Sequence, residues 1–589
     1  MTTPLEDYAM IGDGETAALI SRQGSIDWLC LPRFDSPACF AAILGTGEHG
    51  RWSIAPEAPL ERAAHRYQPG TLVLETDLTT ADGTIRLTDF MPIRDGDPTL
   101  IRMVTGVSGS ITACLELAPR FDYGNMPPWI TRIEDGAVMH VGPDKVVLRG
   151  LGDFEIEKGV IRSRFRVEEG SQHAFIQTYA ASHAPTPEAV DAEAALAQTQ
   201  DYWHDWIGRF DQPIERAAAV RRSLLTLKAL IHRPTGGLVA AATTSLPEQP
   251  GGAMNWDYRY CWLRDATFTL SALVDCGYLE EAAAWRDWIL RAVAGAPDKM
   301  QIAYRVDGAR RLDEAELSWL PGYRFARPVR VGNAAAGQLQ LDVYGELIRT
   351  LHAAEQAGIR RTEQTSRLER AIVEHVERVW VEPDQGLWES RGEPRHYTYS
   401  KVMAWVALDR FLGGKGGDEI SDAGRRRMVA LRDEIHEVTC REGFDPGLGS
   451  FTTYFGGHEV DASLLLLPEV GFLPADDVRM RGTIALIEKT LVVDGLVRRH
   501  LMPDLVPEGA FVACSFWLAE CQLLQGRRAD AVETISRALA IRSELGLLSE
   551  EYDVAGRRLT GNYPQALSHL ALIHALLALA KFDLDGDGD

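Results

Sequence analysis

The sequence predicts a chain of two structural parts, an N-terminal antiparallel β-sandwich and a C-terminal (α/α)6 barrel, joined by linker helices. Two observations predict this fold. The hydrophobic pattern changes from short strand-like runs to helical periodicity near residue 188, and helical segments then follow in close pairs. The predicted boundaries are a sandwich domain at 1–189, a helical linker at 190–212 and a barrel at 213–589. A chain of 589 residues is long enough to bury more than one core.

The first part consists of short apolar runs broken by turn-forming residues. Asp-Gly, Gly-Ser and Pro-containing links separate the runs, which is typical of many short antiparallel strands. Strands are predicted at 16–20, 25–30, 71–78, 84–90, 99–107, 111–117, 137–141, 145–148, 160–167 and 174–180. This spacing favours a sandwich, and it is also compatible with a closed β-barrel.

Two long amphipathic segments, 190–210 and 213–232, join the two parts, and the second of them is the first helix of the barrel. Helices of this part are predicted at 213–232, 265–277, 280–294, 338–358, 362–381, 400–412, 419–438, 461–470, 476–489, 511–524, 529–545 and 564–582. Twelve helices in close pairs suggest six hairpins closed into a ring, and an open bundle or a solenoid is the alternative. The ring depends on this helix count, because the sequence has no repeat of fixed period.

Composition limits the location and the partners of the protein. With 61 basic and 84 acidic residues the net charge is −23, which argues against nucleic acid or an anionic membrane as the main partner. The eight cysteines are scattered without a C-x-x-C pair, so a reducing compartment is expected and neither a zinc site nor a disulfide scaffold. The first residues lack the pattern of a signal peptide, and the apolar stretch 566–580 is too short for a membrane span. We therefore expect a cytoplasmic location. The sequence does not decide whether the protein is a monomer or a homo-oligomer.

The stretch 255–266, NWDYRYCWLRDA, combines aromatic and charged residues closely. Four aromatics alternate there with Asp257, Arg259, Arg264 and Asp265. Aromatic rings stack on the C–H faces of sugars, and paired charged groups bind sugar hydroxyls. The stretch therefore suits a carbohydrate pocket, although a buried Arg–Asp pair at the start of a helix would have the same pattern.

Two further stretches place glutamates among aromatics in predicted loops. Glu389 follows Trp388 in GLWESRGEPRHYTYSKVMAW, 386–405, and Glu550 begins an acid pair in GLLSEEYDVAGRRLTGNY, 546–563. Hydrolysis of an acetal needs one protonated carboxylic acid for the leaving oxygen and one carboxylate to activate water. Apolar neighbours raise a carboxyl pKa, so loop glutamates beside aromatics suit both roles. Taken singly, each is more often a solvated loop residue.

These segments together resemble family 15 of the glycoside hydrolases, the glucoamylase family with its trehalase-like bacterial members. The matching segments are NWDYRYCWLRD at 255–265, GLWESRG at 386–392, RHYTYSKVMAWVALDR at 395–410, LLSEEYD at 547–553 and GNYPQALSHLAL at 561–572. The opening segment 7–40 is similar to the N-terminal domain of the bacterial and archaeal members. The resemblance covers nearly the whole chain and implies the same sandwich and (α/α)6 barrel.

The resemblance also implies roles for particular residues. Glu389, which follows the Trp of the LWE motif, corresponds to the general acid, and Glu550 corresponds to the general base. Arg264 and Asp265 match the pair that holds the hydroxyls of the terminal glucose. The remaining substrate-binding candidates are Tyr258, Trp262, Trp388, Arg499 and Trp319. No metal ion and no cofactor is expected.

Several assignments have competitors within the sequence. Glu393 and Glu551 are rivals for the two catalytic roles and rank lower on motif position alone, and Arg498 is a rival for the arginine of GLVRRH, 495–500. Trp319, in LSWLPGY, is either a wall for the leaving group or a packed loop anchor. Asp342 lies near the sugar site or pairs with an arginine on a buried helix face.

The implied activity is inverting, exo-acting hydrolysis of a small α-glucoside, with glucose released from the non-reducing end. α,α-Trehalose is the expected substrate, since the N-terminal segment resembles the trehalase-like members and a small sugar suits a cytoplasmic enzyme. A glucoamylase or an isomaltose- or dextran-type glucohydrolase is the alternative within this class. A disaccharide phosphorylase and a non-catalytic sugar-binding protein are the alternatives from other classes. Inversion predicts that the carboxyl groups of Glu389 and Glu550 stand roughly 6.5–9.5 Å apart.

Overall fold

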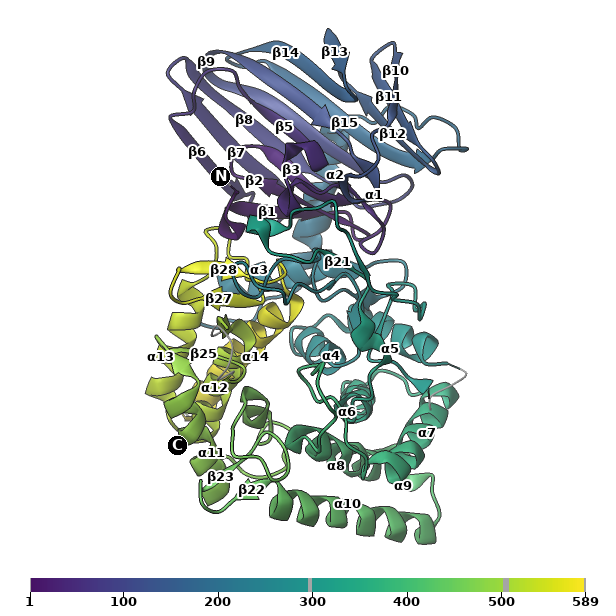
Figure 1. Cartoon of the computed structure of the whole chain (residues 1–589), viewed down its shortest axis with the longest axis vertical. Helices are drawn as coiled ribbons and strands as arrows, with labels where there is room; N and C mark the ends of the chain where they lie inside the picture. The colour runs from purple at the N-terminus through teal and green to yellow at the C-terminus, as the bar shows by residue number, and fades with distance from the viewer. Residues whose placement is uncertain (1, 295–298, 502–507, 587–589) are drawn as a thin grey trace.

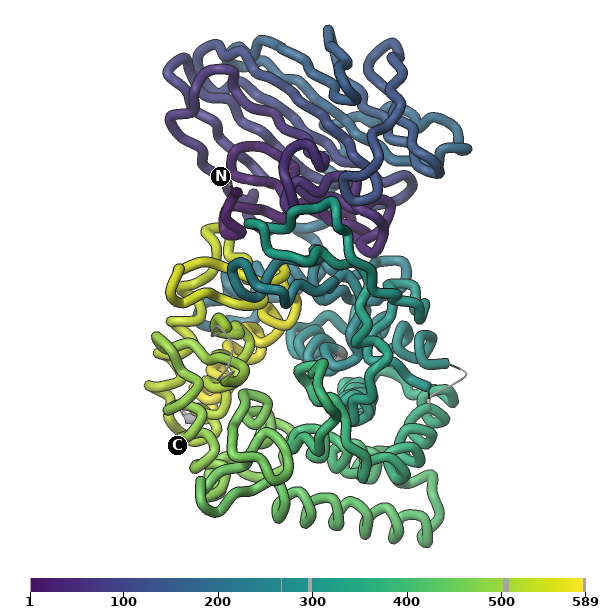
Figure 2. Tube along the Cα trace, viewed as in Figure 1, coloured from purple at the N-terminus to yellow at the C-terminus, as the bar shows by residue number. Residues whose placement is uncertain are grey.

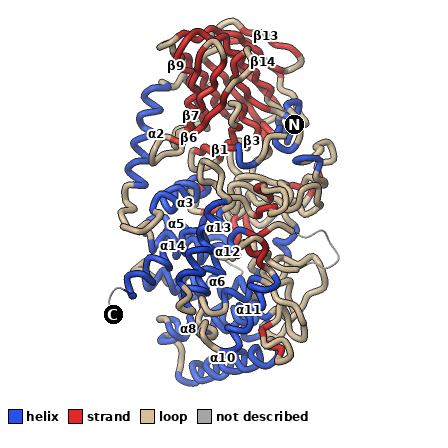
Figure 3. Tube along the Cα trace, turned by 90° about the vertical axis from the view of Figure 1, so that its left-hand side faces the viewer, coloured by secondary structure: helices blue, strands red, loops and turns tan. Residues whose placement is uncertain are grey.

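The computed structural model describes residues 2–294, 299–501 and 508–586. Figure 1 shows a layered group of strands above a ring of helices. The last strand of this group ends at Ala181, and the helix α2 (Ala192–Ile207) follows it. In the perpendicular view of Figure 3 the strands lie at one end of the molecule and the helices at the other, and α2 runs along the side between them.

The N-terminal part is antiparallel throughout its named strands, as the sequence predicts. Its strands are β1 (Tyr8–Gly12), β2 (Ala17–Ser21), β3 (Ser25–Cys30), β4 (Ala38–Phe40), β5 (Arg51–Pro56), β6 (Arg62–Tyr67), β7 (Leu74–Thr80), β8 (Gly83–Phe90), β9 (Thr99–Ala118), β10 (Trp129–Ile133), β11 (Gly136–Val141), β12 (Asp144–Arg149), β13 (Phe154–Glu157), β14 (Val160–Glu168) and β15 (Gln172–Ala181). Their buried leucine, isoleucine and tryptophan side chains form one core with the helical part.

The strand β9 differs from the prediction, which has two strands at 99–107 and 111–117. It is one strand of 20 residues that pairs with β8 and β15 in its first half and with β5 and β14 in its second. The glycines between the two halves do not form a turn. A Cβ on Gly106 would lie 2.0 Å from the Glu168 carbonyl oxygen, and one on Gly109 would lie 2.0 Å from that of Asp82. These glycines therefore allow the neighbouring backbones to approach closely.

The second part is helical. Its helices, together with the short α1 and the connecting α2, are α1 (Phe121–Gly124), α2 (Ala192–Ile207), α3 (Ala217–Leu230), α4 (Asp265–Asp275), α5 (Leu279–Ala292), α6 (Asp342–Gln356), α7 (Glu363–Val379), α8 (Thr398–Gly413), α9 (Lys415–Asp418), α10 (Asp422–Glu442), α11 (Val478–Thr490), α12 (Val512–Leu524), α13 (Arg528–Ala540) and α14 (Ala566–Gly586). Short strands in its loops are β16 (Ile231–His232), β17 (Gly237–Leu238), β18 (Cys261–Trp262), β19 (Ala303–Tyr304), β20 (Ala315–Glu316), β21 (Arg330–Val331), β22 (Phe444–Asp445), β23 (Ser450–Phe451), β24 (Val492–Val493), β25 (Leu496–Val497), β26 (Ala510–Phe511), β27 (Glu551–Asp553) and β28 (Arg558–Thr560).

The helices pack as a ring. α4 packs on α6, α6 on α8, α8 on the 3-10 helix η7 (Ala462–Leu466), η7 on α12, α12 on α14, and α14 returns to α4. α3, α5, α7, α10, α11 and α13 each pack on members of this ring (Figure 1). The segment 461–470 is the exception among the predicted helices, since it forms η7. Pro468 follows η7, lacks an N–H group and disfavours helical backbone in the residue before it.

The helix α14 is long and strongly apolar. Its segment Ala566–Asp585 has the length and the mean hydropathy, 1.5, of a membrane span, whereas the sequence predicts a shorter apolar stretch. About half of its most apolar window, 56%, is buried inside the molecule, and α14 packs on α3, α4, α12 and α13. An apolar surface covered in this way belongs to a core helix of the ring.

The two parts are joined by buried polar contacts. The Trp28 indole donates to the Ala242 carbonyl oxygen at 2.7 Å, and the Tyr563 hydroxyl donates to the Tyr8 carbonyl oxygen at 2.9 Å. Figure 2 shows the corresponding segments, near the N-terminus and near the C-terminal end of the chain, side by side. The Arg259 guanidinium reaches from the helical part to the Ser36 carbonyl oxygen at 2.8 Å. Because such buried groups are costly to leave unpaired, these contacts fix how the parts sit together.

Candidate active site

A cavity of about 520 Å³ lies where the loops before the ring helices meet. Loops that precede α4, α8, η7, α12 and α14 all contribute side chains to its wall. Those of particular interest are Glu248, Trp256, Tyr258, Arg264, Trp388, Glu389, Arg391, Asp461, Arg499, Glu550 and Gln565. A concave site lined by aromatics and a few convergent charged groups has the character of a small-molecule site.

The aromatic stretch 255–266 divides into a structural half and a cavity half. Arg259 and Asp257 form a fully buried pair, 2.6 Å apart, that also contacts the N-terminal part. Arg264 lines the cavity, and its Nε donates to Asp265 at 3.0 Å. Asp265 is the first residue of α4 and lies behind Arg264, outside the cavity lining. One half of the stretch therefore contacts the N-terminal part, and the other contributes Arg264 to the cavity.

Glu389 receives two hydrogen bonds on one carboxylate oxygen. The Trp262 indole donates to Oε1 at 2.7 Å, and Nη1 of Arg264 donates to the same atom at 3.1 Å. Trp262 is buried behind the lining, where β18 pairs with β19, so it contacts the carboxylate and not the cavity. Neither of these hydrogen bonds uses the second oxygen, Oε2.

The loop that carries Glu389 is held tightly. Glu389 has a φ of 57°, unusual for a residue other than glycine, and its N–H donates to the Gly386 carbonyl oxygen at 3.1 Å. The Gln338 side chain donates to the carbonyl oxygens of Glu389 and Ser390 at 3.2 and 3.1 Å. Left-handed backbone costs about 1 kcal/mol and persists only where its surroundings impose it, as these contacts do here.

Glu550 is almost completely buried, with 1% of its surface exposed. Its Oε2 accepts from the Asn562 N–H at 3.3 Å, and the Tyr258 hydroxyl hydrogen-bonds to the same side chain. Burial raises the pKa of Glu550 above its ordinary value, while the Tyr258 bond and the Arg499 charge oppose that rise. Gly561 is required beside it, because a Cβ there would lie 2.6 Å from both Cβ and Oε2 of Glu550.

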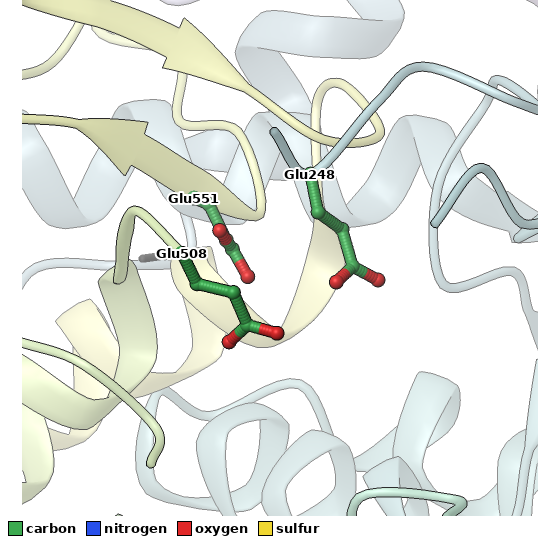
Figure 4. Close-up of side chains that lie close together, drawn as sticks. All are labelled: Glu248, Glu508 and Glu551. Atoms are coloured by element: carbon green, nitrogen blue, oxygen red, sulfur yellow. The ribbon is translucent and has the colours of Figure 1, made fainter. Parts of the chain in front are cut away.

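Three buried glutamates, Glu248, Glu508 and Glu551, lie close together (Figure 4). Arg499 contacts all three of them. Its Nη2 contacts an oxygen of each: Glu508 at 2.8 Å, Glu551 at 3.8 Å and Glu248 by a hydrogen bond. One oxygen from each glutamate lies within 4.8 Å of the others, a spacing that could hold a metal ion. The guanidinium already supplies a positive charge there, so this donor set favours the arginine over a metal ion.

The pKa values of the three glutamates are shifted in different directions. Burial opposes ionisation of Glu508, yet Arg499 holds its pKa below the ordinary value. Burial raises the pKa of Glu248 to about 8 and that of Glu551 well above the ordinary range, although Arg499 lowers both. The Arg499 charge therefore favours the ionised form of Glu508, whereas burial favours the protonated forms of Glu248 and Glu551.

The aromatic walls come from separate helices and loops. Trp388 packs edge-on against Phe511 at 5.3 Å, and its indole donates to Asp461 at 3.2 Å. Trp319 is not part of the lining. Its indole donates to the Tyr123 carbonyl oxygen at 3.0 Å, so the structure places it as an anchor between the two parts of the chain.

The structure also separates the rival residues. Glu389, Glu550 and Arg499 line the cavity, as do Tyr258, Arg264 and Trp388. Glu551 is fully buried outside the lining, Glu393 is exposed, and Arg498 is outside the lining too. Asp342 is fully buried on α6, and neither carboxylate oxygen has a hydrogen-bond partner in the described part of the chain. Burial and neighbouring Asp384 raise its pKa to about 8, against the opposing charge of Arg264.

Several lining residues have little signal in the sequence. Glu248 stands alone in SLPEQPGG, 245–252, and Asp461 belongs to a segment with a helical pattern. Gln565 lies in the motif GNYPQALSHLAL without a chemical reason to select it. Trp256 and Arg391 lie inside the quoted motifs, where their charge and aromatic character could have marked them.

The fold and the paired carboxylates define a glycoside hydrolase, and comparison with known proteins agrees. The profile of glycosyl hydrolases family 15 matches residues 215–541, and that of the trehalase-like N-terminal domain matches residues 1–203. The chain belongs to glycosyl hydrolases family 15.

Similar proteins extend this result over the whole chain. A trehalase of Mycobacterium tuberculosis is 37% identical over 99% of this chain and 91% of the relative. A trehalase of Thermoplasma volcanium is 35% identical over 97% of this chain and 92% of the relative. The solved structure of a bacterial glucoamylase complexed with acarbose has the same overall fold, with a TM-score of 0.72 at 12% identity, over 99% of this chain and 94% of that chain.

Proposed function

We propose that this protein is a trehalase, which hydrolyses α,α-trehalose with inversion at the attacked carbon. The observation that carries the proposal is that Glu389 and Glu550 line one cavity in environments that suit opposite roles. The trehalase names of relatives that match nearly the full length support trehalose as the substrate.

Glu389 acts as the general acid. Two donors already bind Oε1, so the proton is carried by Oε2, the oxygen that can reach the glycosidic oxygen of a bound sugar. Transfer of this proton lets the second glucose leave as a neutral alcohol. Trp262 and Arg264 then stabilise the carboxylate that results, because both direct N–H groups at it.

Glu550 acts as the general base. Its ionised form takes a proton from a water molecule that attacks the anomeric carbon on the face away from the leaving group. Burial makes this carboxylate a stronger base, while the Tyr258 hydrogen bond and the Arg499 charge limit the rise in its pKa. Inversion requires a carboxyl separation of roughly 6.5–9.5 Å, which leaves room for the water.

The terminal glucose is held between charged and aromatic groups. Arg264 and Arg499 present guanidinium N–H groups to its hydroxyls, and Tyr258 and Trp388 contact its apolar faces. Trp262 and Asp265 act from behind these residues by fixing Glu389 and Arg264.

The proposal includes the finer architecture and the location. The closed contact circuit of α4, α6, α8, η7, α12 and α14 supports an (α/α)6 barrel, and the antiparallel strands support a β-sandwich. The proposed boundaries are a sandwich at 1–189, a linker at 190–212 and a barrel at 213–589. All eight cysteines are free, which supports a cytoplasmic location.

The test is the anomeric composition of the first products, followed by NMR. Inverting hydrolysis of trehalose yields one β-glucose from the attacked sugar and one α-glucose from the leaving sugar, so the initial ratio is 1:1. A retaining enzyme gives α-glucose alone. Phosphate-dependent formation of glucose 1-phosphate would identify a phosphorylase instead.

A second candidate is a glucohydrolase for another α-glucoside. An isomaltose glucohydrolase of Kribbella flavida is 25% identical over 46% of this chain and 66% of the relative. Parallel assays with maltose and isomaltose decide between the two, and faster turnover of either sugar would replace trehalose in the proposal.

A further inference from the structure

The cavity has a buried end and an open end. Glu550 and Arg499 are 1% and 7% exposed, whereas the Arg391 side chain, also in the lining, is 38% exposed. Arg391 lies two residues after Glu389, on the same loop. An exo-acting site holds the terminal sugar at its closed end, so the second sugar faces the open end, on the side of the general acid.

The Arg391 side chain is fixed in the free protein. Its Nη2 donates to Glu314 Oε2 at 3.1 Å and to Asn333 Oδ1 at 3.3 Å. The guanidinium lies 4.5 Å from the Trp256 ring centre, and the Arg330 guanidinium lies 4.6 Å from the same ring. Glu314 is held in turn by the Ala334 N–H at 3.0 Å. Arginine fixed in this way loses little conformational freedom when it binds a ligand.

Both hydrogen bonds use Nη2, so they do not commit Nη1 or Nε of the guanidinium. A guanidinium presents its N–H groups as a planar fork that two neighbouring sugar oxygens can accept. In trehalose the leaving glucose is bonded through C1, so its C2 hydroxyl is adjacent to the oxygen that Glu389 protonates. A residue two positions beyond Glu389 is well placed for that hydroxyl.

We propose that Arg391, anchored by Glu314, Asn333 and Trp256, binds the hydroxyls of the leaving glucose and selects an α-linked glucose disaccharide. This role rests on the proposed glucoside hydrolysis. All α-glucosides present the same terminal glucose to the buried end, so that end does not distinguish one substrate from another. The Arg391 charge at the open end contacts the sugar that differs between them.

The experiment compares trehalose with α-glucosyl fluoride, a substrate that has the terminal glucose but no leaving sugar. Arg391→Ala is expected to lower kcat/KM for trehalose about 10- to 100-fold, the range for loss of a charged hydrogen bond, mainly through KM. The same variant is expected to hydrolyse the fluoride at the wild-type rate. Arg391→Lys, which keeps the charge, is expected to recover part of the trehalose activity.

The matched control is Arg395→Ala. Arg395 is exposed on the same loop, lies 4.2 Å from the Tyr454 ring centre and is not in the lining, so trehalose and fluoride rates should both stay at wild type. An equal loss on both substrates in Arg391→Ala would show a structural role, and unchanged trehalose kinetics would show no role; either result overturns the proposal.

A different substrate preference is a separate outcome. If the wild type prefers maltose or isomaltose, trehalose as substrate fails, and the same variants are compared on the preferred disaccharide and on the fluoride. A loss confined to the disaccharide still supports Arg391, and a loss shared with the fluoride overturns it.

Discussion

Glu389 and Glu550 line the same cavity, but their carboxyl groups have different surroundings. The Glu389 side chain is 15% exposed and is fixed by direct hydrogen bonds from Trp262 and Arg264. Glu550 is buried, accepts few hydrogen bonds and has one oxygen, Oε1, without a partner in the described residues. One carboxyl group is oriented by donors, whereas the other is controlled mainly by exclusion from water.

In the proposed mechanism, this difference gives two residues of the same type different chemistry. An acid at the leaving-group side needs a fixed direction, because its proton must reach one oxygen atom. A base needs a raised affinity for protons, and burial supplies it without any special partner. The Arg499 charge opposes part of the rise in the pKa of Glu550 that burial causes.

The strongest test of the comparison removes each carboxylate in turn. Glu550→Gln is expected to lower kcat about 10³- to 10⁴-fold on both trehalose and α-glucosyl fluoride, because both need an activated water. Glu389→Gln is expected to lower kcat on trehalose about 10²- to 10⁴-fold and on the fluoride less than tenfold, because fluoride leaves without a proton. Steady-state kinetics with both substrates measure this.

A circular dichroism melt controls for folding in both variants. Equal losses on the two substrates in Glu389→Gln would contradict its role as the acid. A loss confined to trehalose in Glu550→Gln would contradict its role as the base.

A smaller change moves the Glu550 side chain and leaves its carboxylate intact. Gly561→Ala places a methyl group against Glu550 and is expected to lower kcat/KM about 100-fold, the cost of about 1 Å of misplacement. Gly449→Ala is the matched control: Gly449 has a φ of 66°, and a Cβ there meets nothing within 4 Å. Both variants carry the backbone strain of a left-handed alanine, so only the first should lose activity. Similar kinetics in the two would show that contact with Glu550 does not matter.

The buried glutamates around Arg499 also predict that the stability of the protein depends on pH. Burial, aided by Glu508 and opposed by Arg499, raises the pKa of Glu551 well above its ordinary value. Above the ordinary pKa of a glutamate the unfolded chain loses this proton while the folded protein keeps it, so the free energy of unfolding falls as pH rises. Glu551→Gln removes this dependence and should gain on the wild type by up to about 1.4 kcal/mol per pH unit.

Urea unfolding at pH 5 and pH 8 measures the effect, with Glu393→Gln, an exposed glutamate, as control. A stability difference that is the same at both pH values would mean that Glu551 is ionised in the folded protein.

The sequence predicts the paired carboxylates because each lies in a continuous motif with its own aromatic and charged neighbours. Periodicity likewise predicts most helices of the ring, since an amphipathic face repeats over many residues. Glu248 and Asp461 were not predictable, because each comes alone from a separate loop and joins the site only through the fold. β9 was missed for a local reason: Gly106 and Gly109 are typical of a turn, and only the approach of neighbouring backbones explains them.

The sequence also does not separate residues that face the cavity from those behind it. Trp262 and Arg264 are two positions apart and both contact Glu389, yet only Arg264 is in the lining. The direction of each side chain decides which residue faces the cavity, and neither the hydrophobic pattern nor the composition predicts that direction.

The smallest expected effect concerns Trp319, an aromatic outside the cavity. Trp319→Phe replaces the indole by a smaller aromatic ring and removes the hydrogen bond to the Tyr123 carbonyl oxygen. It should lower the free energy of unfolding by about 0.5–1.5 kcal/mol. kcat and KM for trehalose should stay at wild type, because the Trp262 and Arg264 bonds to Glu389 do not involve this residue. Thermal melts and steady-state kinetics on one preparation test both points. A raised KM with unchanged stability would return Trp319 to the substrate site and would mean that the open end of the cavity reaches the junction of the two parts.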